Sequence, residues 1–341
     1  MIKRIKIGAG SCGLASGSGE VLEFFKKNLE GYEIVEVGCI GHCYAEPIVE
    51  VETPEGSIFY DNVKPDMKNV TRISGLDMDS RFIPAQSRTS KELLKVTKLA
   101  GRINPVSIEE YERNGGHLAL KKALSMESAA VVEDVKKSGL RGRGGAGFPT
   151  GLKWSFLAAK QSDRKILICN ADEGDPGAFM DRSMMESVPH QVLEGMLIGV
   201  HATGASEIFI YCRAEYPLAL KNLRIAADQI EKKGYDMING RKINIMIKEG
   251  AGAFVCGEET AMINSLEGKR GTPRFRPPFP TDSGYKGYPS LINNVETFAN
   301  IPVLINEGGE NYAKIGTQGS KGTKLFALAG DIKNPGLVEV P

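Results

Sequence analysis

With 341 residues, of which 41% are apolar and 25% charged, the chain has enough material for two or three globular domains. Its 43 basic and 42 acidic side chains nearly cancel, which excludes nucleic acid or an anionic membrane as a partner held by bulk charge. No apolar run approaches the roughly 18 residues of a membrane span, and no signal-peptide core follows Met1, so direct membrane insertion is not expected. Six cysteines in so long a chain do not make a disulfide framework, so the predicted compartment is the reducing cytoplasm.

Residues 1–70 are predicted to form a small α+β unit. Its expected elements, in chain order, are a strand at 2–7, a helix at 19–29, a strand at 32–37 and a hairpin of 47–51 with 57–60. Cys12, Cys39 and Cys43 fall in the loops of this unit. Thiolates clustered in loops suit an iron–sulfur cluster.

This arrangement resembles the thioredoxin-like two-iron ferredoxin fold, which implies a [2Fe–2S] cluster. Those domains use four cysteines, whereas this unit has only three, and Ile7 stands where a further cysteine is expected. A cluster would therefore need Ser11, another ligand or another chain to complete it. The alternative is a docking module that keeps the fold without the cluster.

Residues 71–90 lack periodicity and are predicted to be a linker to a larger domain at 91–322. That domain is expected to begin with helical segments at 90–100, 107–113 and 118–124.

Short apolar strands then alternate with amphipathic helices. The strands are predicted at 165–169, 207–212 and 243–248, and the helices at 189–203 and 216–233. This alternation predicts an α/β domain with a parallel sheet. Cys169 and Cys212 fall within the strands and are expected to be core residues.

Residues 141–156 are unusually rich in glycine, with five between Gly142 and Gly151. Glycines leave backbone N–H groups unshielded, and such groups form anion sites, above all where a helix begins. The positive side chains here are Arg141, Arg143 and Lys153, and the flat aromatic ones are Phe148, Trp154 and Phe156. A predicted helix at 127–139 precedes the segment, so it is no ordinary Rossmann turn. The composition indicates a nucleotide or flavin site, with a flexible loop that binds nothing as the alternative.

Two acidic loops follow predicted strands, at 170–177 and 250–260. Ligands of parallel sheets bind at the carboxyl ends of the strands. Because carboxylates repel phosphate, these loops are expected to hold the sugar and ring of a ligand. A divalent metal on Asp172, Glu173 and Asp175 is a competing interpretation, and a solvated acidic turn is another.

A proline-rich segment at 268–280 is stiff enough to cover a pocket, and its Phe279 could stack on a ligand. Asn293 and Asn294 then open a predicted helix. Their amides could recognise a polar ring edge or serve as helix caps.

In this order, the segments resemble the NADH-binding flavoprotein of respiratory complex I, a module that recurs in NAD-linked hydrogenases and formate dehydrogenases. The matching blocks are 141–156, 170–177, 250–260, 269–280 and 293–297. The resemblance implies FMN deep in the site, NADH above it, and hydride transfer from nicotinamide to flavin. The acidic loops disfavour the additional phosphate of NADPH.

By this resemblance, the residues expected to hold FMN are Gly142, Gly144, Asn170, Asp172, Gly257, Glu258, Asn293, Asn294 and Thr297. Those expected to hold NADH are Gly145, Phe148, Lys153, Phe156, Asp175, Glu259 and Phe279, and Glu259 is assigned to catalysis. Phe254 is also placed at the cofactor site, where the family often carries Tyr, and Asp175 stands where Glu is common. Both departures bear on nucleotide affinity or redox tuning.

The implied chemistry needs one-electron acceptors, because hydride brings two electrons and the flavin releases them singly. In the family, a C-terminal domain with four cysteines carries a [4Fe–4S] cluster, and this chain has no such domain. Residues 323–341 resemble the opening strands of the family's β-grasp domain, which suggests a truncated chain.

The predicted function is therefore an NADH dehydrogenase (diaphorase) module of a larger electron-transfer complex. Its expected partners are iron–sulfur subunits and a thioredoxin-like ferredoxin subunit. The alternative is a non-catalytic docking subunit that retains the fold without flavin.

Overall fold

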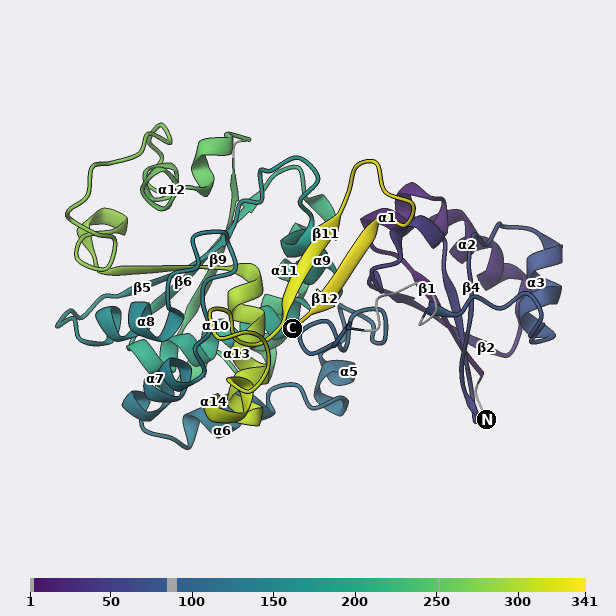
Figure 1. Cartoon of the computed structure of the whole chain (residues 1–341), viewed down its shortest axis with the longest axis horizontal. Helices are drawn as coiled ribbons and strands as arrows, with labels where there is room; N and C mark the ends of the chain where they lie inside the picture. The colour runs from purple at the N-terminus through teal and green to yellow at the C-terminus, as the bar shows by residue number, and fades with distance from the viewer. Residues whose placement is uncertain (1–2, 85–90, 251) are drawn as a thin grey trace.

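A computed structural model describes residues 3–84, 91–250 and 252–341. The N-terminal unit lies at one end of the molecule, and a larger α/β domain lies at the other (Figure 1). Ile2 of the first predicted strand, residues 85–90 of the predicted linker and Ala251 of the second acidic loop lie outside the described residues.

The N-terminal unit contains the predicted β-α-β-β arrangement. Its sheet has the order β2-β1-β3-β4, with β1 and β2 parallel and the other pairs antiparallel. The bounds are β1 Lys3–Gly8, α1 Ser11–Ala15, α2 Ser18–Asn28, β2 Tyr32–Val37, β3 Val49–Thr53, β4 Gly56–Tyr60 and α3 Met67–Ser74. Helix α3 extends into the segment predicted as a linker, because its Val70 and Ile73 are buried in the same core as Ile5 and Phe25.

The predicted parallel sheet is present and has four strands in the order β10-β5-β6-β9. They are β5 Ile166–Ala171, β6 Glu207–Arg213, β9 Asn244–Gly250 and β10 Ser290–Asn294. The first three match predicted strands. Strand β10 was expected only as the start of a helix, because its five residues end in two asparagines.

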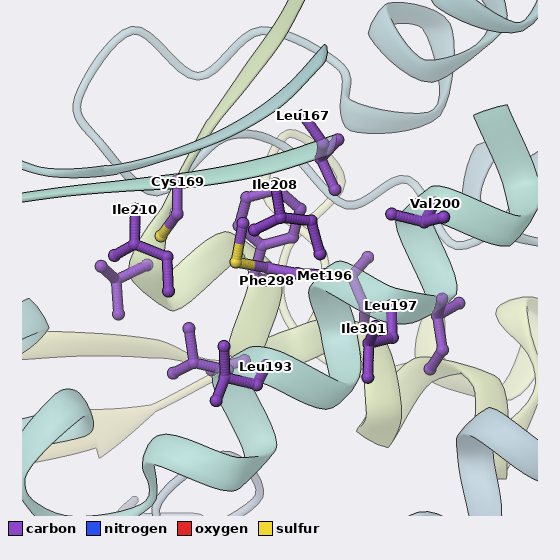
Figure 2. Close-up of a cluster of buried hydrophobic side chains, with 14 of the residues drawn as sticks. Leu167, Cys169, Leu193, Met196, Leu197, Val200, Ile208, Ile210, Phe298 and Ile301 are labelled. Carbon is purple, nitrogen blue, oxygen red and sulfur yellow. The ribbon is translucent and has the colours of Figure 1, made fainter. Parts of the chain in front are cut away.

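Helices cover both faces of the sheet. On one face, Leu167 and Ile208 pack against α10 (Pro189–Thr203) and α13 (Val295–Glu307), as Figure 2 shows. On the other face, Ile168 packs with α12 (Glu259–Leu266). Helices α10 and α13 approach so closely that a Cβ on Gly195 would lie 2.0 Å from the Phe298 carbonyl oxygen. Cys169 and Cys212 are fully buried in the sheet, as predicted.

The remaining elements complete the large domain. They are α5 Ile108–Arg113, α6 Leu118–Leu124, α7 Ser128–Lys137, α8 Thr150–Ala158, α9 Met180–Ser187, α11 Pro217–Lys233, β7 Met237–Ile238, β8 Arg241–Lys242 and α14 Gly309–Tyr312. Helices α5 and α6 confirm two of the predicted leading helices. The predicted helix at 90–100 is wrong, since residues 91–100 form turns, bends and irregular backbone.

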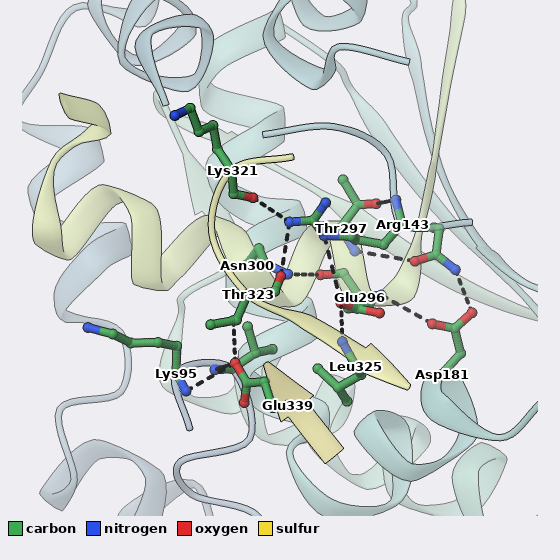
Figure 3. Close-up of polar contacts among 12 residues, drawn as sticks. Lys95, Arg143, Asp181, Glu296, Thr297, Asn300, Lys321, Thr323, Leu325 and Glu339 are labelled. Atoms are coloured by element: carbon green, nitrogen blue, oxygen red, sulfur yellow. Dashed lines mark hydrogen bonds and ion pairs between the residues drawn. The ribbon is translucent and has the colours of Figure 1, made fainter. Parts of the chain in front are cut away.

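Residues 93–97 are held instead by the C-terminal hairpin of β11 (Lys324–Leu328) and β12 (Gly336–Val340), which confirms the two strands expected near the end of the chain. The buried carboxylate of Glu339 accepts hydrogen bonds from the amides of Lys95, Val96 and Thr97 at 2.9–3.0 Å. It also accepts from the hydroxyls of Thr97 and Thr323 (Figure 3). These long-range bonds take the amides that a helix would have used.

Several contacts between described residues join the N-terminal unit to the large domain. The Leu337 amide donates to the Gly41 carbonyl at 2.9 Å, Arg4 pairs with Glu110, and Ser11 donates to the Glu186 carboxylate. Among the described helices, none combines the length and the apolar character needed to cross a bilayer.

We expect Glu339→Gln to lower the free energy of unfolding by about 3 kcal/mol, because the new amide would point an N–H group at buried donors. Urea unfolding measures the change. Glu310→Gln is the matched control, since Glu310 is 81% exposed and lies 3.9 Å from its ion-pair partner Lys137. Equal losses of stability in the two variants would contradict the assigned role of Glu339.

Candidate functional site

A cavity of about 1020 Å³ opens at the carboxyl edge of the parallel sheet. Most of the residues predicted to bind a cofactor line it: Gly142, Gly144, Phe148, Lys153, Phe156, Asn170, Gly257, Glu258, Glu259, Phe279, Asn293 and Asn294. The structure thus brings together five segments that are far apart in the sequence.

The other five predicted residues do not line this cavity. Gly145 lies in the glycine-rich loop, and Asp175 is an exposed residue of the first acidic loop. Phe254 is 69% exposed and packs over Gly174, on which a Cβ would lie 2.8 Å from its ring. Thr297 is fully buried, and Asp172 lies next to Gly257, where a Cβ would be 3.8 Å from its Oδ2.

The glycine-rich loop is closed by backbone hydrogen bonds before α8 begins. The Gly142 amide donates to the Phe148 carbonyl, and the Thr150 amide donates to the Leu140 carbonyl, both at 2.9 Å. Gly145 and Gly147 have φ values of 104° and 64°, which favour glycine. A Cβ on either would meet nothing within 4 Å. The loop therefore exposes bare backbone, as an anion site requires.

Arg143 does not supply mobile positive charge to the cavity, contrary to the prediction. Its side chain is buried, and its Nη2 donates to the carbonyls of Lys321 and Thr323 at 2.6 and 2.9 Å. Its backbone amide donates to Thr297 Oγ1 at 2.9 Å. Arg143 and Thr297 therefore fix the loop to α13 and to the segment before β11.

Trp154 is also buried and does not offer its face to a ligand, contrary to the prediction. Its indole Nε1 donates to Asn293 Oδ1 at 2.9 Å and so orients that amide. Phe148, Phe156 and Phe279 are about half exposed and remain available for stacking. The ring centroids of Phe148 and Phe156 lie 6.4 Å apart.

The charged groups of the cavity are paired with one another. Lys153 Nζ donates to the Glu259 carboxylate and to the Ile292 carbonyl. Arg276 lies 3.7 Å from Glu258 and 3.8 Å from Glu259. Sequence reasoning missed Arg276, although its position among the prolines of the covering segment was a signal.

The side-chain amides and carboxylates of the two acidic loops mostly build the edge of the cavity. Asn170 Nδ2 donates to the Gly257 carbonyl at 2.9 Å. Glu258 caps α12, because its Oε2 accepts from the amides of Thr260 and Ala261 at 2.8 and 2.9 Å. Asp172 Oδ2 is buried without a hydrogen-bond partner, and burial raises the pKa of this carboxyl to about 6.

The buried carboxyls of Asp181 and Glu296 belong to the set of polar contacts around Arg143 and Thr297 (Figure 3). Asp181 accepts from the Asn294 side-chain amide and, at 3.3 Å, from the Glu296 backbone amide. Burial and the neighbouring Glu173 and Glu296 carboxylates raise the pKa of Asp181 well above its usual value. Asn294 also caps α13 by accepting from the Thr297 amide at 3.3 Å. The two asparagines thus end a strand, open a helix and line the cavity.

Cys12, Cys39 and Cys43 come together in the N-terminal unit, as predicted, with all three Sγ atoms within 4.8 Å of one another. Hydrogen bonds with Cys39 and Cys43, followed by the charge of Arg182, lower the pKa of Cys12 to about 3. Such a set of thiolates could hold an iron–sulfur cluster or a single metal ion. In the part of the chain that the structure describes, Asp172, Glu173 and Asp175 do not converge as a metal site.

The fold and the cavity define an α/β domain that binds a phosphate-bearing heteroaromatic cofactor. Comparisons with known proteins specify the class. Residues 135–303 match the family model described as the Nuo51 FMN-binding domain. Residues 135–303, about half of the chain, belong to this family, and the cofactor is FMN.

Two curated relatives are similar to the chain over most of its length. The chain is 53% identical over 262 residues to the HndC subunit of the NADP-reducing hydrogenase of Solidesulfovibrio fructosivorans, a match that covers 75% of this chain and 53% of the relative. It is 47% identical over 267 residues to the F subunit of the NADH-quinone oxidoreductase of Aquifex aeolicus, with coverages of 76% and 62%. The chain therefore spans only about half to three-fifths of these relatives.

The crystal structure of an NAD⁺-reducing [NiFe]-hydrogenase in the H2-reduced state superimposes with a TM-score of 0.65 at 29% identity. This match covers 99% of the present chain and 58% of that chain.

The residues present fit FMN. The bare amides of the glycine-rich loop suit its phosphate. A side chain at Gly144 would crowd the site, because its Cβ would lie only 3.1 Å from that of Asn294. The unpartnered Asp172 Oδ2 can accept a hydrogen bond from a hydroxyl of the ribityl chain.

The carboxyl of Glu296 makes stability depend on pH. Burial raises its pKa from 4.5 to about 8, although the hydrogen bond from Leu325 N and the charge of Arg143 oppose the shift. Between these values the folded chain holds a proton that the unfolded chain has lost, so the free energy of unfolding falls as pH rises. The stabilisation is fully present below pH 4.5 and is lost as the pH rises through about 8.

Glu296→Gln should therefore flatten the dependence of stability on pH in this window, by up to about 1.4 kcal/mol per pH unit. Urea unfolding of both proteins at several pH values provides the two profiles. Their difference isolates Glu296 from the other titrating groups. Parallel profiles would show that Glu296 is not protonated in the folded chain.

Proposed function

We propose that this chain is an NADH-oxidising flavin module of a larger electron-transfer complex. The observation that carries the proposal is the cavity in which a bare glycine-rich loop, paired asparagines and exposed aromatic rings meet. When bound, FMN accepts hydride from nicotinamide and releases the electrons singly. The protein's own residues bind and orient the two nucleotides.

The inner part of the cavity holds FMN in this proposal. Gly144 offers its backbone amide to phosphate, and Gly142 closes the loop through its bond to the Phe148 carbonyl, while Asn293 and Asn294 face the ring. Asp172 accepts from the ribityl chain, and Asn170 with Gly257 shapes the wall between them. Thr297 acts indirectly, by holding the Arg143 amide and hence the loop. Glu258 likewise acts by capping α12.

The outer part holds NADH. Phe148, Phe156 and Phe279 are the faces on which adenine stacks, and Lys153 and Arg276 attract the pyrophosphate. Glu259 accepts hydrogen bonds from ribose hydroxyls and keeps Lys153 in place. Gly145, Phe254 and Asp175 do not line the cavity, so in this proposal they contact the nucleotide only at its edges.

Electrons leave to iron–sulfur subunits of the complex, with a thioredoxin-like ferredoxin subunit among them. The names of the relatives support this, since HndC belongs to an NADP-reducing hydrogenase and the Aquifex aeolicus relative belongs to an NADH-quinone oxidoreductase. We assign NADH rather than NADPH to this chain, because Glu258 and Glu259 repel an added phosphate.

An anaerobic visible spectrum of the purified chain, before and after one equivalent of NADH, tests the proposal. We expect flavin bands that bleach on reduction. A protein that stays colourless after FMN is added would instead be a docking subunit without catalysis. Flavin that NADH leaves oxidised would mean that the donor is a different molecule.

Glu259→Gln should raise the KM for NADH about tenfold, because the amide replaces a charged hydrogen-bond acceptor for the ribose. The content of FMN should not change. Steady-state kinetics with an artificial electron acceptor measure the effect. Glu207→Gln is the matched control, because Glu207 pairs with Arg164 at the amino end of β6, far from the cavity. An unchanged KM in Glu259→Gln would remove Glu259 from the site.

A further inference from the structure

The three cysteines of the N-terminal unit form a compact triangle next to the large domain. Their Sγ atoms all lie within 4.8 Å of one another, and those of Cys39 and Cys43 are 3.8 Å apart. Cys39 is buried, whereas Cys12 and Cys43 are partly exposed. One side of the triangle is therefore open to solvent, while the other is shielded.

This donor set does not fit a [2Fe–2S] cluster. A two-iron cluster takes two ligands on each iron, and its four ligands form two separated pairs. Here there are three thiolates, and each is adjacent to both of the others. Ser11, one of the alternatives for a fourth ligand, is already engaged, because its amide and its hydroxyl donate to the Glu186 carboxylate at 2.9 and 2.5 Å.

The triangle does fit one tetrahedral ion. Zinc–thiolate bonds of about 2.3 Å place neighbouring sulfurs of a tetrahedron about 3.8 Å apart. The Cys39–Cys43 separation of 3.8 Å has this value. The Gly41 amide donates to Cys39 Sγ at 3.2 Å and so orients one ligand, as an outer hydrogen bond to a metal site does.

The charges around the triangle suit a divalent ion. Three thiolates with one divalent cation leave a single negative charge. Arg182, on helix α9 of the large domain, lies beside Cys12 and acts on it electrostatically. Arg182 shares its positive charge with Glu186, whose Oε1 lies 3.8 Å from its Nε, and the Glu46 carboxyl adds negative charge near Cys12, so the site suits a cation rather than an anion.

We propose that Cys12, Cys39 and Cys43 bind one thiophilic divalent ion of the zinc class, with a fourth position open to water or to a ligand from another chain. The three thiolates, one from α1 and two from the segment after β2, would tie these parts of the unit together next to α9. The site does not depend on flavin or on NADH, so it stands apart from the proposed function.

Titration of the reduced, metal-free full-length chain with Co²⁺, under anaerobic conditions, tests the proposal. We expect saturation at one ion per chain, with the visible bands of a tetrahedral thiolate complex, and displacement by Zn²⁺. Cys12→Ser, Cys39→Ser and Cys43→Ser should each lose these bands. Cys212→Ala is the matched control and should keep them, because Cys212 is buried in β6.

Metal and acid-labile sulfide analysis of the wild-type chain gives a second readout that needs no variant to fold. One zinc and no sulfide would support the single-ion site. Two irons with two sulfides per chain after anaerobic reconstitution would overturn it in favour of a [2Fe–2S] cluster. Cobalt bands that survive all three serine substitutions would overturn it as well. Neither result depends on flavin reduction, so failure here is distinct from failure of the proposed function.

Discussion

The buried guanidinium of Arg143 is the constraint on which the candidate site depends. A loop made largely of glycine has few side chains with which to hold its own position. Arg143 supplies the anchor, because its Nη2 donates to two carbonyls before β11 and its backbone amide donates to Thr297 of α13. Burying a guanidinium is favourable only when such partners are present. The loop, helix α13 and the C-terminal hairpin are therefore positioned together (Figure 3).

The same set of contacts continues through helix α9 to the N-terminal unit. Asp181, at the start of α9, binds Asn294 and the Glu296 amide beneath the cavity. Glu186, near the end of α9, binds Ser11 beside Cys12. One short helix thus contacts both the floor of the flavin cavity and the cysteine triangle. Its buried carboxyls are tolerable because each accepts hydrogen bonds from neighbouring donors.

The hydrophobic pattern of the sequence predicted correctly those strands and helices whose burial follows from their own residues. The strands β5 and β6 read as continuous apolar runs, and α10 has the predicted bounds, because each is buried on the side that its pattern implies. The segment 91–100 has a helical pattern, but Glu339 binds its amides from the other end of the chain. No window of sequence around those residues contains that information.

In the cavity, too, the sequence could not predict everything: the directions of the side chains depend on contacts made by distant parts of the chain. Composition identified most of the segments that line it, but it did not give the directions of Arg143 and Trp154, which turn into the core. Among the described residues, the cations that line the cavity are Lys153, Lys160 and Arg276, and each is already paired with a carboxylate of the cavity. A dinucleotide phosphate must therefore exchange one ion pair for another, which yields little net Coulomb energy. Most of the affinity must then come from backbone amides and aromatic stacking, the two features for which glycine and phenylalanine are required.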